Sequence, residues 1–142
     1  MKFRDYFSLK HIIFALVLLT IMFLFAIRQS NNMVKVYFED EHLEVVSSKY
    51  SMTVGYDEIL SAELITMPHQ GEKADDDAWD DDLIRTGNWI NDTWGSYCVC
   101  ADLDTSNCIV LHLDDGSTYV FSRKSDATNR KLFEELQTHL QK

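Results

Sequence analysis

The residues best suited to chemistry form an acidic run in the middle of the chain. Six aspartates fall within eight positions, as two triplets: Asp75, Asp76, Asp77, Asp80, Asp81 and Asp82. Carboxylate oxygens are the ligands that Ca²⁺ prefers, so a divalent-cation site is one hypothesis. The run lacks the alternating ligands and closing glutamate of a helix–loop–helix calcium site. The alternative is a solvated acidic loop, or a short helix that ends at Gly87.

The same segment, residues 67–95, contains all three tryptophans, Trp79, Trp89 and Trp94. It interrupts the strand pattern around it for far longer than the ~2–6 residues of a usual connection. Exposed tryptophan is favoured at the centre of protein interfaces. These three side chains are therefore candidates for a partner-binding surface, and packing against the wall of the domain is the alternative.

The three cysteines lie at Cys98, Cys100 and Cys108. Alternation along two predicted neighbouring strands turns all three side chains outward. A connecting loop with an odd number of residues would set Cys100 opposite Cys108. A Cys100–Cys108 disulfide is therefore one hypothesis, and unreactive thiols are the alternative. A zinc site with His112 is disfavoured, since the chain contains no Cys-x-x-Cys pair.

No arrangement in the sequence is typical of catalysis. The five histidines are scattered through the chain: His11, His42, His69, His112 and His139. There is no nucleophile elbow, phosphate-binding glycine loop or His-x-x-x-His pair. We therefore expect a protein that is not an enzyme and that has no cofactor.

Length and composition bound the remaining possibilities. The 142 residues include 13 Lys and Arg, 23 Asp and Glu and a single proline, with 46% hydrophobic residues. This composition is typical of a folded chain with one domain, or a smaller domain with a tether. The net charge of −10 argues against nucleic acid as a partner, because its backbone is bound by clustered basic residues.

An apolar stretch near the N-terminus predicts a transmembrane helix over residues 11–28. Residues 11–27 contain no Asp, Glu, Lys or Arg and would form a helix about 25 Å long. A basic flank, residues 1–10, precedes the stretch, and a linker at 29–33 is expected to follow it. A cleaved signal peptide is the main alternative, but Ile27 and Arg28 stand where a cleavage site has small residues. A buried soluble helix is a further alternative.

The flanking charges favour a single-pass protein of the cell membrane with its N-terminus in the cytoplasm and its domain outside. Lys2, Arg4 and Lys10 precede the apolar stretch, whereas only Arg28 and Lys35 lie close behind it. Residues 29–142 carry nine Lys and Arg against 22 Asp and Glu, a net charge of −13.

The rest of the chain predicts a β-rich domain. Short alternating runs indicate strands near residues 34–38, 43–45, 50–56 and 60–64, and again at 96–103, 108–113 and 117–122. A tight turn is expected at Asp114-Asp115-Gly116. A C-terminal helix capped by Ser125 follows, with one apolar stripe: Leu132, Phe133, Leu136 and Leu140.

These residues resemble the bacterial pleckstrin-homology-like (PH-like) domains found in membrane-tethered proteins. The resemblance rests on segments 42–65, 86–103 and 109–140, with Tyr56-Asp57-Glu58-Ile59 closing a hairpin and an Asp-Gly turn before the last strand. It implies a small antiparallel barrel of about seven strands, closed by one C-terminal helix, over residues 34–142. A phosphoinositide ligand is not expected, because Lys49 is a lone base near Glu39, Asp40, Glu41 and Glu44.

Two functional hypotheses follow from the sequence. The first is a membrane-anchored, non-catalytic interaction module that binds a protein partner. The second is an extracytoplasmic sensor domain whose acidic loop binds a divalent cation.

Overall fold

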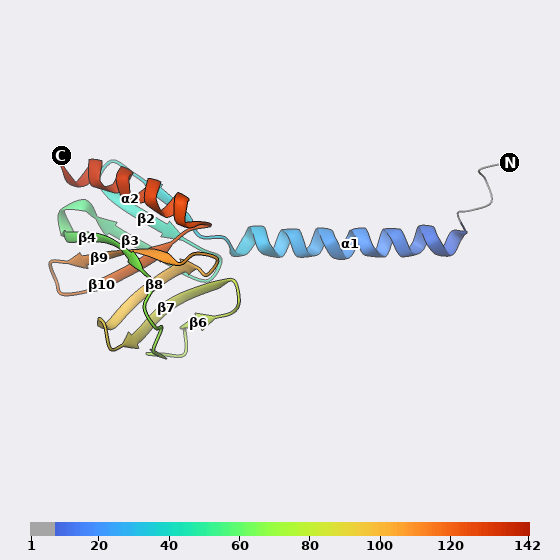
Figure 1. Ribbon diagram of the computed structural model, residues 1–142, viewed down its shortest axis with the longest axis horizontal. Helices are drawn as coiled ribbons and strands as arrows, with labels where there is room; N and C mark the ends of the chain where they lie inside the picture. The colour runs from blue at the N-terminus through green and yellow to red at the C-terminus, as the bar shows by residue number, and fades with distance from the viewer. Residues whose placement is uncertain (1–7) are drawn as a thin grey trace. The chain divides into compact units, whose positions relative to one another are not determined.

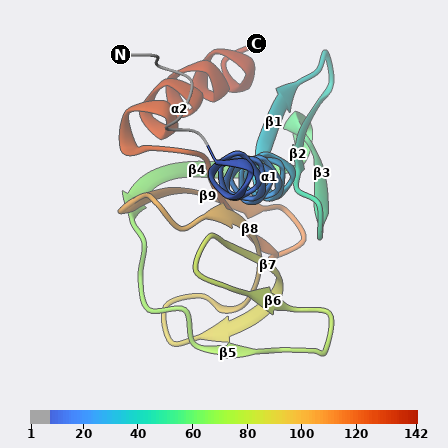
Figure 2. The same cartoon turned by 90° about the vertical axis from the view of Figure 1, so that its right-hand side faces the viewer.

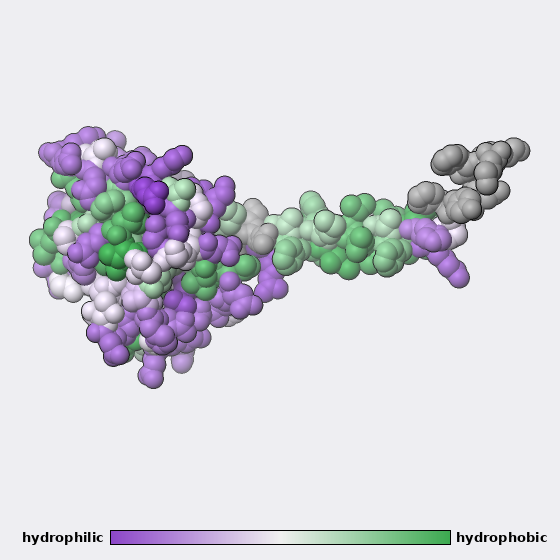
Figure 3. All heavy atoms as spheres, in the orientation of Figure 1, coloured by the Kyte–Doolittle hydropathy of each residue, from purple (hydrophilic) through white to green (hydrophobic). Residues whose placement is uncertain are grey.

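The computed structural model describes residues 8–142 and divides between Asn31 and Asn32 into two compact units. Nearly all of helix α1 (Leu9–Asn32) belongs to the first unit (Figure 1). Its side chains from Leu9 to Arg28 are all exposed. The Leu9–Arg28 stretch has a mean hydropathy of 2.4 and is long and apolar enough to cross a membrane. Its side chains form a hydrophobic surface along the helix (Figure 3).

The helix differs from expectation at both ends. It begins at Leu9, two residues before the predicted span, and it continues through Asn32, so most of the predicted linker at 29–33 is helical. Residues 29–32 include no Pro or Gly that would end a helix. Residues 1–7 of the predicted basic flank lie outside the described residues.

The second unit is mainly β, as predicted, and begins with a three-stranded antiparallel sheet. Its strands are β1 (Lys35–Phe38), β2 (His42–Val46) and β3 (Ser51–Gly55), in the order β1-β2-β3. Alternate side chains of β2 and β3 are buried, which matches the period of two in the sequence. A single 3-10 turn, η1 (Tyr56–Glu58), then leads into the second sheet.

The larger sheet has the order β4-β9-β10-β8-β7-β5. Its members are β4 (Ile59–Thr66), β9 (Asn107–Leu113), β10 (Thr118–Ser122), β8 (Gly95–Asp102), β7 (Ile84–Asn91) and β5 (Glu72–Lys73). A further short strand, β6 (Trp79–Asp80), pairs with β7. The turn between β9 and β10 is where the sequence predicted it, with Gly116 at a φ of +88°.

The pairing corrects the expected antiparallel barrel. Strand β8 runs parallel to β10, and β10 separates it from β9. No ladder joins the two sheets in the described part of the chain, so they do not close into a barrel. At the end of this parallel ladder, the Ser122 hydroxyl donates a hydrogen bond to the Asp102 carbonyl oxygen at 2.7 Å.

Both faces of the larger sheet are buried, and each has its own core. The first core joins one face to the three-stranded sheet and to the C-terminal helix. Its largest members include Phe121, Leu43, Ile84, Ile109, Leu111 and Leu136. The second core lies on the opposite face and contains Ala78, Trp89, Tyr97, Val99, Ala101, Cys108, Val110 and Val120. Each face of the larger sheet therefore needs its own covering layer of the chain.

Helix α2 (Asp126–Leu140) completes the first core, as predicted. The Ser125 side chain caps it by accepting a hydrogen bond from the Thr128 amide. Leu132 and Leu136 are buried in the core, and Phe133 and Leu140 pack at its margin. The helix contacts β4 and β9, and Figure 2 shows it beside β1 as well.

A buried carboxylate fixes the point where the chain enters the domain. The Asp102 side chain accepts hydrogen bonds from the amides of Val34, at 3.3 Å, and Lys124, at 2.9 Å. Arg123 donates from Nε to the Val34 carbonyl oxygen at 3.1 Å, so side chains satisfy both backbone groups of this fully buried residue. Burial raises the pKa of the Asp102 carboxyl more than these bonds lower it.

We predict that Leu136→Asp destabilises the domain by about 2–5 kcal/mol, because it buries a charge without a partner. Leu136 has no exposed surface. Urea unfolding of the full chain in detergent, followed by tryptophan fluorescence, measures the change. The matched control is Lys131→Asp at an exposed position of the same helix, for which we expect less than about 1 kcal/mol. Equal midpoints for the two variants would contradict the packing of α2 described here.

Candidate functional site in residues 67–95

Residues 67–95, which the sequence predicts to be a long loop, contribute strands to the larger sheet. Strand β7 occupies eight of its residues and lies between β8 and β5. The short helix ending at Gly87 is also wrong, since Gly87 lies within β7 at a φ of +91°. A Cβ at Gly87 would lie 2.9 Å from the Ala78 Cα, so glycine lets the preceding turn pack directly on the strand.

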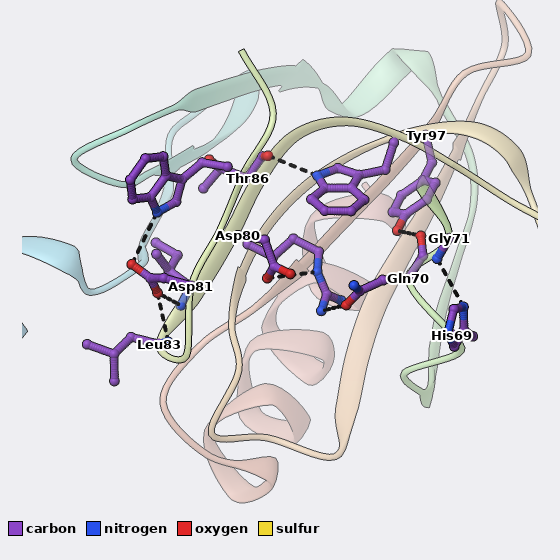
Figure 4. Close-up of polar contacts among 12 residues, drawn as sticks. His69, Gln70, Gly71, Asp80, Asp81, Leu83, Thr86 and Tyr97 are labelled. Atoms are coloured by element: carbon purple, nitrogen blue, oxygen red, sulfur yellow. Dashed lines mark hydrogen bonds and ion pairs between the residues drawn. The ribbon is translucent and has the colours of Figure 1, made fainter. Parts of the chain in front are cut away.

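Two of the six aspartates shape tight turns. The Asp75 carboxylate accepts hydrogen bonds from the Asp77 and Ala78 amides, both at 3.1 Å. The Asp81 carboxylate accepts from the Leu83 amide at 2.8 Å and the Ile84 amide at 2.9 Å (Figure 4). Aspartate bonded to the backbone two and three residues on is a recurrent way of holding a turn. These carboxylates therefore position the strands that follow them.

A third aspartate belongs to a polar cluster beneath β7. Asp80 Oδ1 lies 3.4 Å from Arg85 Nε as an ion pair, and both side chains are largely buried. The Arg85 guanidinium also donates to Gln70 Oε1 and lies over the Trp89 ring, 5.5 Å from its centroid. Tyr97 donates its hydroxyl to the Gln70 carbonyl oxygen at 2.7 Å (Figure 4). Burial raises the pKa of Tyr97 to about 12, so it stays a donor at neutral pH.

This cluster was not foreseen from the sequence. Arg85 is 9% exposed, although arginine is rarely buried without a partner. Its partners Asp80 and Gln70 belong to residues 69–81, which lie over the second face of the sheet. Tyr97, which bonds to Gln70, belongs to β8. The cluster ties residues 69–81 to the second face of the sheet, with Asp80 Oδ1 and Arg85 Nε meeting as an ion pair and not as a hydrogen bond.

The geometry does not support the divalent-cation hypothesis. Among residues 8–142, no group of three or more His, Cys, Asp or Glu side chains is placed to hold a metal ion. Asp76, Asp77 and Asp82 are exposed, while Asp75, Asp80 and Asp81 make the contacts described above. Three of the six aspartates thus have structural contacts in different places, at two turns and in the Arg85 ion pair, and the other three are exposed.

The three tryptophans occupy different environments. Trp89 is 2% exposed and donates its indole N–H to the Thr86 carbonyl oxygen at 3.0 Å, so its predicted place in a partner surface is wrong. Trp94 is half-buried and packs edge-on against Tyr97. Trp79 is 39% exposed, and the Lys49 ammonium lies 4.4 Å from its ring centroid. Trp79 alone remains substantially exposed to a partner.

The predicted disulfide is also wrong. Cys98, Cys100 and Cys108 are free thiols, and β10 separates the strands that contain Cys100 and Cys108. Those two residues belong to the first and second core respectively, on opposite faces of the sheet. Burial raises the pKa of each of these two thiols to about 12, which keeps them protonated and weakly nucleophilic.

Comparison with known proteins adds no identification: no family model, no curated protein and no solved structure matches the chain.

We predict that Trp89→Ala destabilises the domain by about 3–5 kcal/mol, the usual cost of truncating a buried aromatic side chain. Trp79→Ala should cost only about 1 kcal/mol, the order of its exposed cation–π contact. Urea unfolding of the full chain followed by circular dichroism, with wild type as reference, measures both. Costs of similar size would show that Trp79 belongs to the core and not to the surface.

We also predict three free thiols after denaturation without reductant, and no native-state labelling of Cys100 or Cys108 at pH 8. The folded-state pKa values of about 12 lie above the ordinary 9.0. The unfolded chain therefore loses these protons first, and stability falls as the pH rises from 9 towards 12. Labelling followed by intact mass counts the thiols. Fewer than three without reductant, or labelling of Cys100 in the folded protein, would contradict the assignment.

Proposed function

We propose that this chain is a single-pass membrane protein whose residues 34–142 form a non-catalytic module that binds another protein. The observation that carries the proposal is helix α1, whose stretch Leu9–Arg28 has a mean hydropathy of 2.4 and no buried residues. A helical stretch of twenty residues that is predominantly apolar and has no buried residue in its own chain is stabilised by a bilayer. A domain attached to such a helix acts at the membrane surface.

The contacts of the reactive side chains support a non-catalytic role. His139 stacks between the rings of Phe38 and Tyr56, with centroids 5.3 and 4.8 Å away. His112 Nε2 lies 3.8 Å from Glu63 Oε2 at the surface of the domain. Cys100 and Cys108 are buried thiols with raised pKa values. His139 and the two thiols serve packing, and His112 pairs with Glu63 and contacts the Thr118 hydroxyl through Nδ1 at 3.4 Å.

The charge distribution supports a protein partner over phosphoinositide. The turn between β2 and β3 contains one base, Lys49, and its ammonium is engaged with the Trp79 ring. Recognition of a polyanionic headgroup needs several converging bases. The net charge of −13 over residues 29–142 likewise disfavours nucleic acid.

Chain length limits where such a partner can be found. Six residue steps separate Arg28, the last residue of the apolar stretch, from Val34, which is buried and bonded through both backbone groups. Even fully extended, this stretch would span only about 20 Å. The point where the chain enters the domain therefore lies within about 20 Å of the end of the apolar stretch, which favours a partner that is itself membrane-associated.

We further propose that the N-terminus is cytoplasmic and the domain outside, from the excess of Lys and Arg before the apolar stretch. The proposal does not depend on a PH-like barrel. The domain has the order of a PH-like domain in that its strands are followed by one C-terminal helix. It differs from an antiparallel barrel in that β8 and β10 pair in parallel.

We predict that the protein stays in the membrane pellet during alkaline carbonate extraction, because removal of α1 from the bilayer would expose its apolar surface. Its intact mass should correspond to a chain that retains residues 11–28. A variant with Leu16, Leu19 and Phe23 changed to Asp should be lost from the pellet. Release of the wild type into the supernatant, or a mature chain that begins near residue 29, would refute the proposal.

A further inference from the structure

The two sheets end in strands that differ in how well their outer edges are protected. Natural proteins protect such edges with bulges, Lys, Pro, short length or a covering element. Strand β4 has a bulge between Ile59 and Ser61 and contacts α2, and β5 is two residues long. Strand β1 contains Lys35 and lies beside α2, where Phe38 stacks on His139.

Strand β3 shows none of these protections in the described structure. Its register with β2 is continuous, its sequence Ser-Met-Thr-Val-Gly contains no Lys or Pro, and Figure 2 shows it as the outer strand of its sheet. The Ser51 and Thr53 side chains are exposed, whereas Met52 and Val54 point into the core. The edge strand is therefore held in place by the two side chains that it buries in the first core.

The hydrogen-bond pattern shows which backbone groups of β3 face outward. At its two ends the β2–β3 hairpin is bonded by the Ser47 amide to Tyr50, at 2.8 Å, and the Tyr56 amide to Glu41, at 3.1 Å. Bonded and non-bonded pairs alternate along an antiparallel ladder. Met52 and Val54 therefore bond to β2, and the N–H and C=O groups of Ser51 and Thr53 point away from it.

An acidic groove adjoins this edge. The cavity, of about 670 Å³, is lined by Thr53 and Gly55 of β3, by His42 of β2 and by three acidic residues, Asp40, Glu41 and Asp57. The stacked rings of Tyr56 and His139 form part of its wall, and Lys142 is its one lysine. A strand added to β3 would run next to Thr53 and Gly55, which line this groove, so basic side chains near that end of the strand would lie in the field of its acidic residues.

We propose that β3 accepts an extended, basic segment of a membrane-associated protein as a fourth strand of the smaller sheet. Backbone groups of Ser51 and Thr53 would supply the pairing, and Asp40, Glu41 and Asp57 would select Lys or Arg. A second copy of this chain is a poorer occupant, because residues 29–142 carry a charge of −13. This inference rests on the proposed function and names the chemistry of its partner.

The test uses the full chain in lipid nanodiscs and the peptide Lys-Val-Lys-Val-Lys-Val-Lys, with the corresponding glutamate peptide as its control. Amide exchange is followed by NMR. Because two outward N–H groups gain acceptors, exchange at Ser51 and Thr53 should slow at least about tenfold with the basic peptide, and not with the acidic one. Slowing elsewhere, without slowing at these two amides, would overturn the proposal.

Two variants separate edge pairing from general charge attraction. Thr53→Pro removes an outward donor without removing a β2–β3 bond, whereas Thr53→Val keeps the donor. We expect roughly tenfold weaker peptide binding for the proline variant and no change for valine. Protection of the Met52 and Val54 amides confirms that the hairpin remains folded. The combined variant Asp40→Asn, Glu41→Gln, Asp57→Asn should weaken binding by a similar factor while leaving the hairpin intact.

In intact cells, a photo-crosslinking residue at Ser51 should form an adduct that Thr53→Pro abolishes and Thr53→Val retains. The adduct should map to an extended Lys- or Arg-containing segment of another membrane-associated protein. An adduct with a second copy of this chain, or one insensitive to Thr53→Pro, would overturn the inference. The extraction experiment is independent, so a protein that stays in the pellet without such an adduct refutes only the role of β3.

Discussion

The arrangement of the domain depends on the hydrogen bonds of Asp102. Its side-chain carboxylate accepts from the Val34 amide at the start of the domain and from the Lys124 amide before α2. Its backbone carbonyl oxygen accepts from the Ser122 hydroxyl. A buried charge is costly unless such donors surround it. Satisfying this one group brings together the chain entry and the ends of β8 and β10, and it fixes the start of α2. The parallel pairing of β8 with β10 is thus inseparable from the way in which the anchored chain enters its domain.

Burial of both faces of the larger sheet explains the features peculiar to this chain. The three-stranded sheet and α2 cover the first face, and residues 69–81 cover the second through Ala78 and the Arg85 cluster. The aspartates shape the turns of this cover, and Trp89 fills the space beneath it. The segment that has the composition of a functional loop is therefore largely a structural cover for the sheet, and the recognition edge that we propose lies elsewhere, on β3.

The same two-sided burial decided what the sequence could reveal. Helix α1 was predicted from its continuous apolar stretch, and the stripe of α2 and the strands of the smaller sheet were predicted from their helical and alternating periods. Strand β7 was missed because Arg85, Thr86 and Gly87 are all buried, so no alternation of polar and apolar residues marks it. The cysteine register failed for a related reason, since it assumed one solvent-facing side, whereas Cys100 and Cys108 are buried on opposite sides. Pairing between distant segments, such as Arg85 with Gln70, has no local signal.

The central claim is that α1 crosses a bilayer and tethers a protein-binding domain. Nitroxide labels placed singly from Leu9 to Arg28 in lipid nanodiscs test it most directly, through their accessibility to oxygen and to a water-soluble nickel complex. Every side chain of this stretch is exposed in its own chain, so we expect oxygen accessibility to peak near the middle, nickel accessibility to be lowest there, and neither profile to repeat every ~3.6 residues. Nickel access throughout the stretch, or a 3.6-residue repeat that reveals a buried face, would contradict the account.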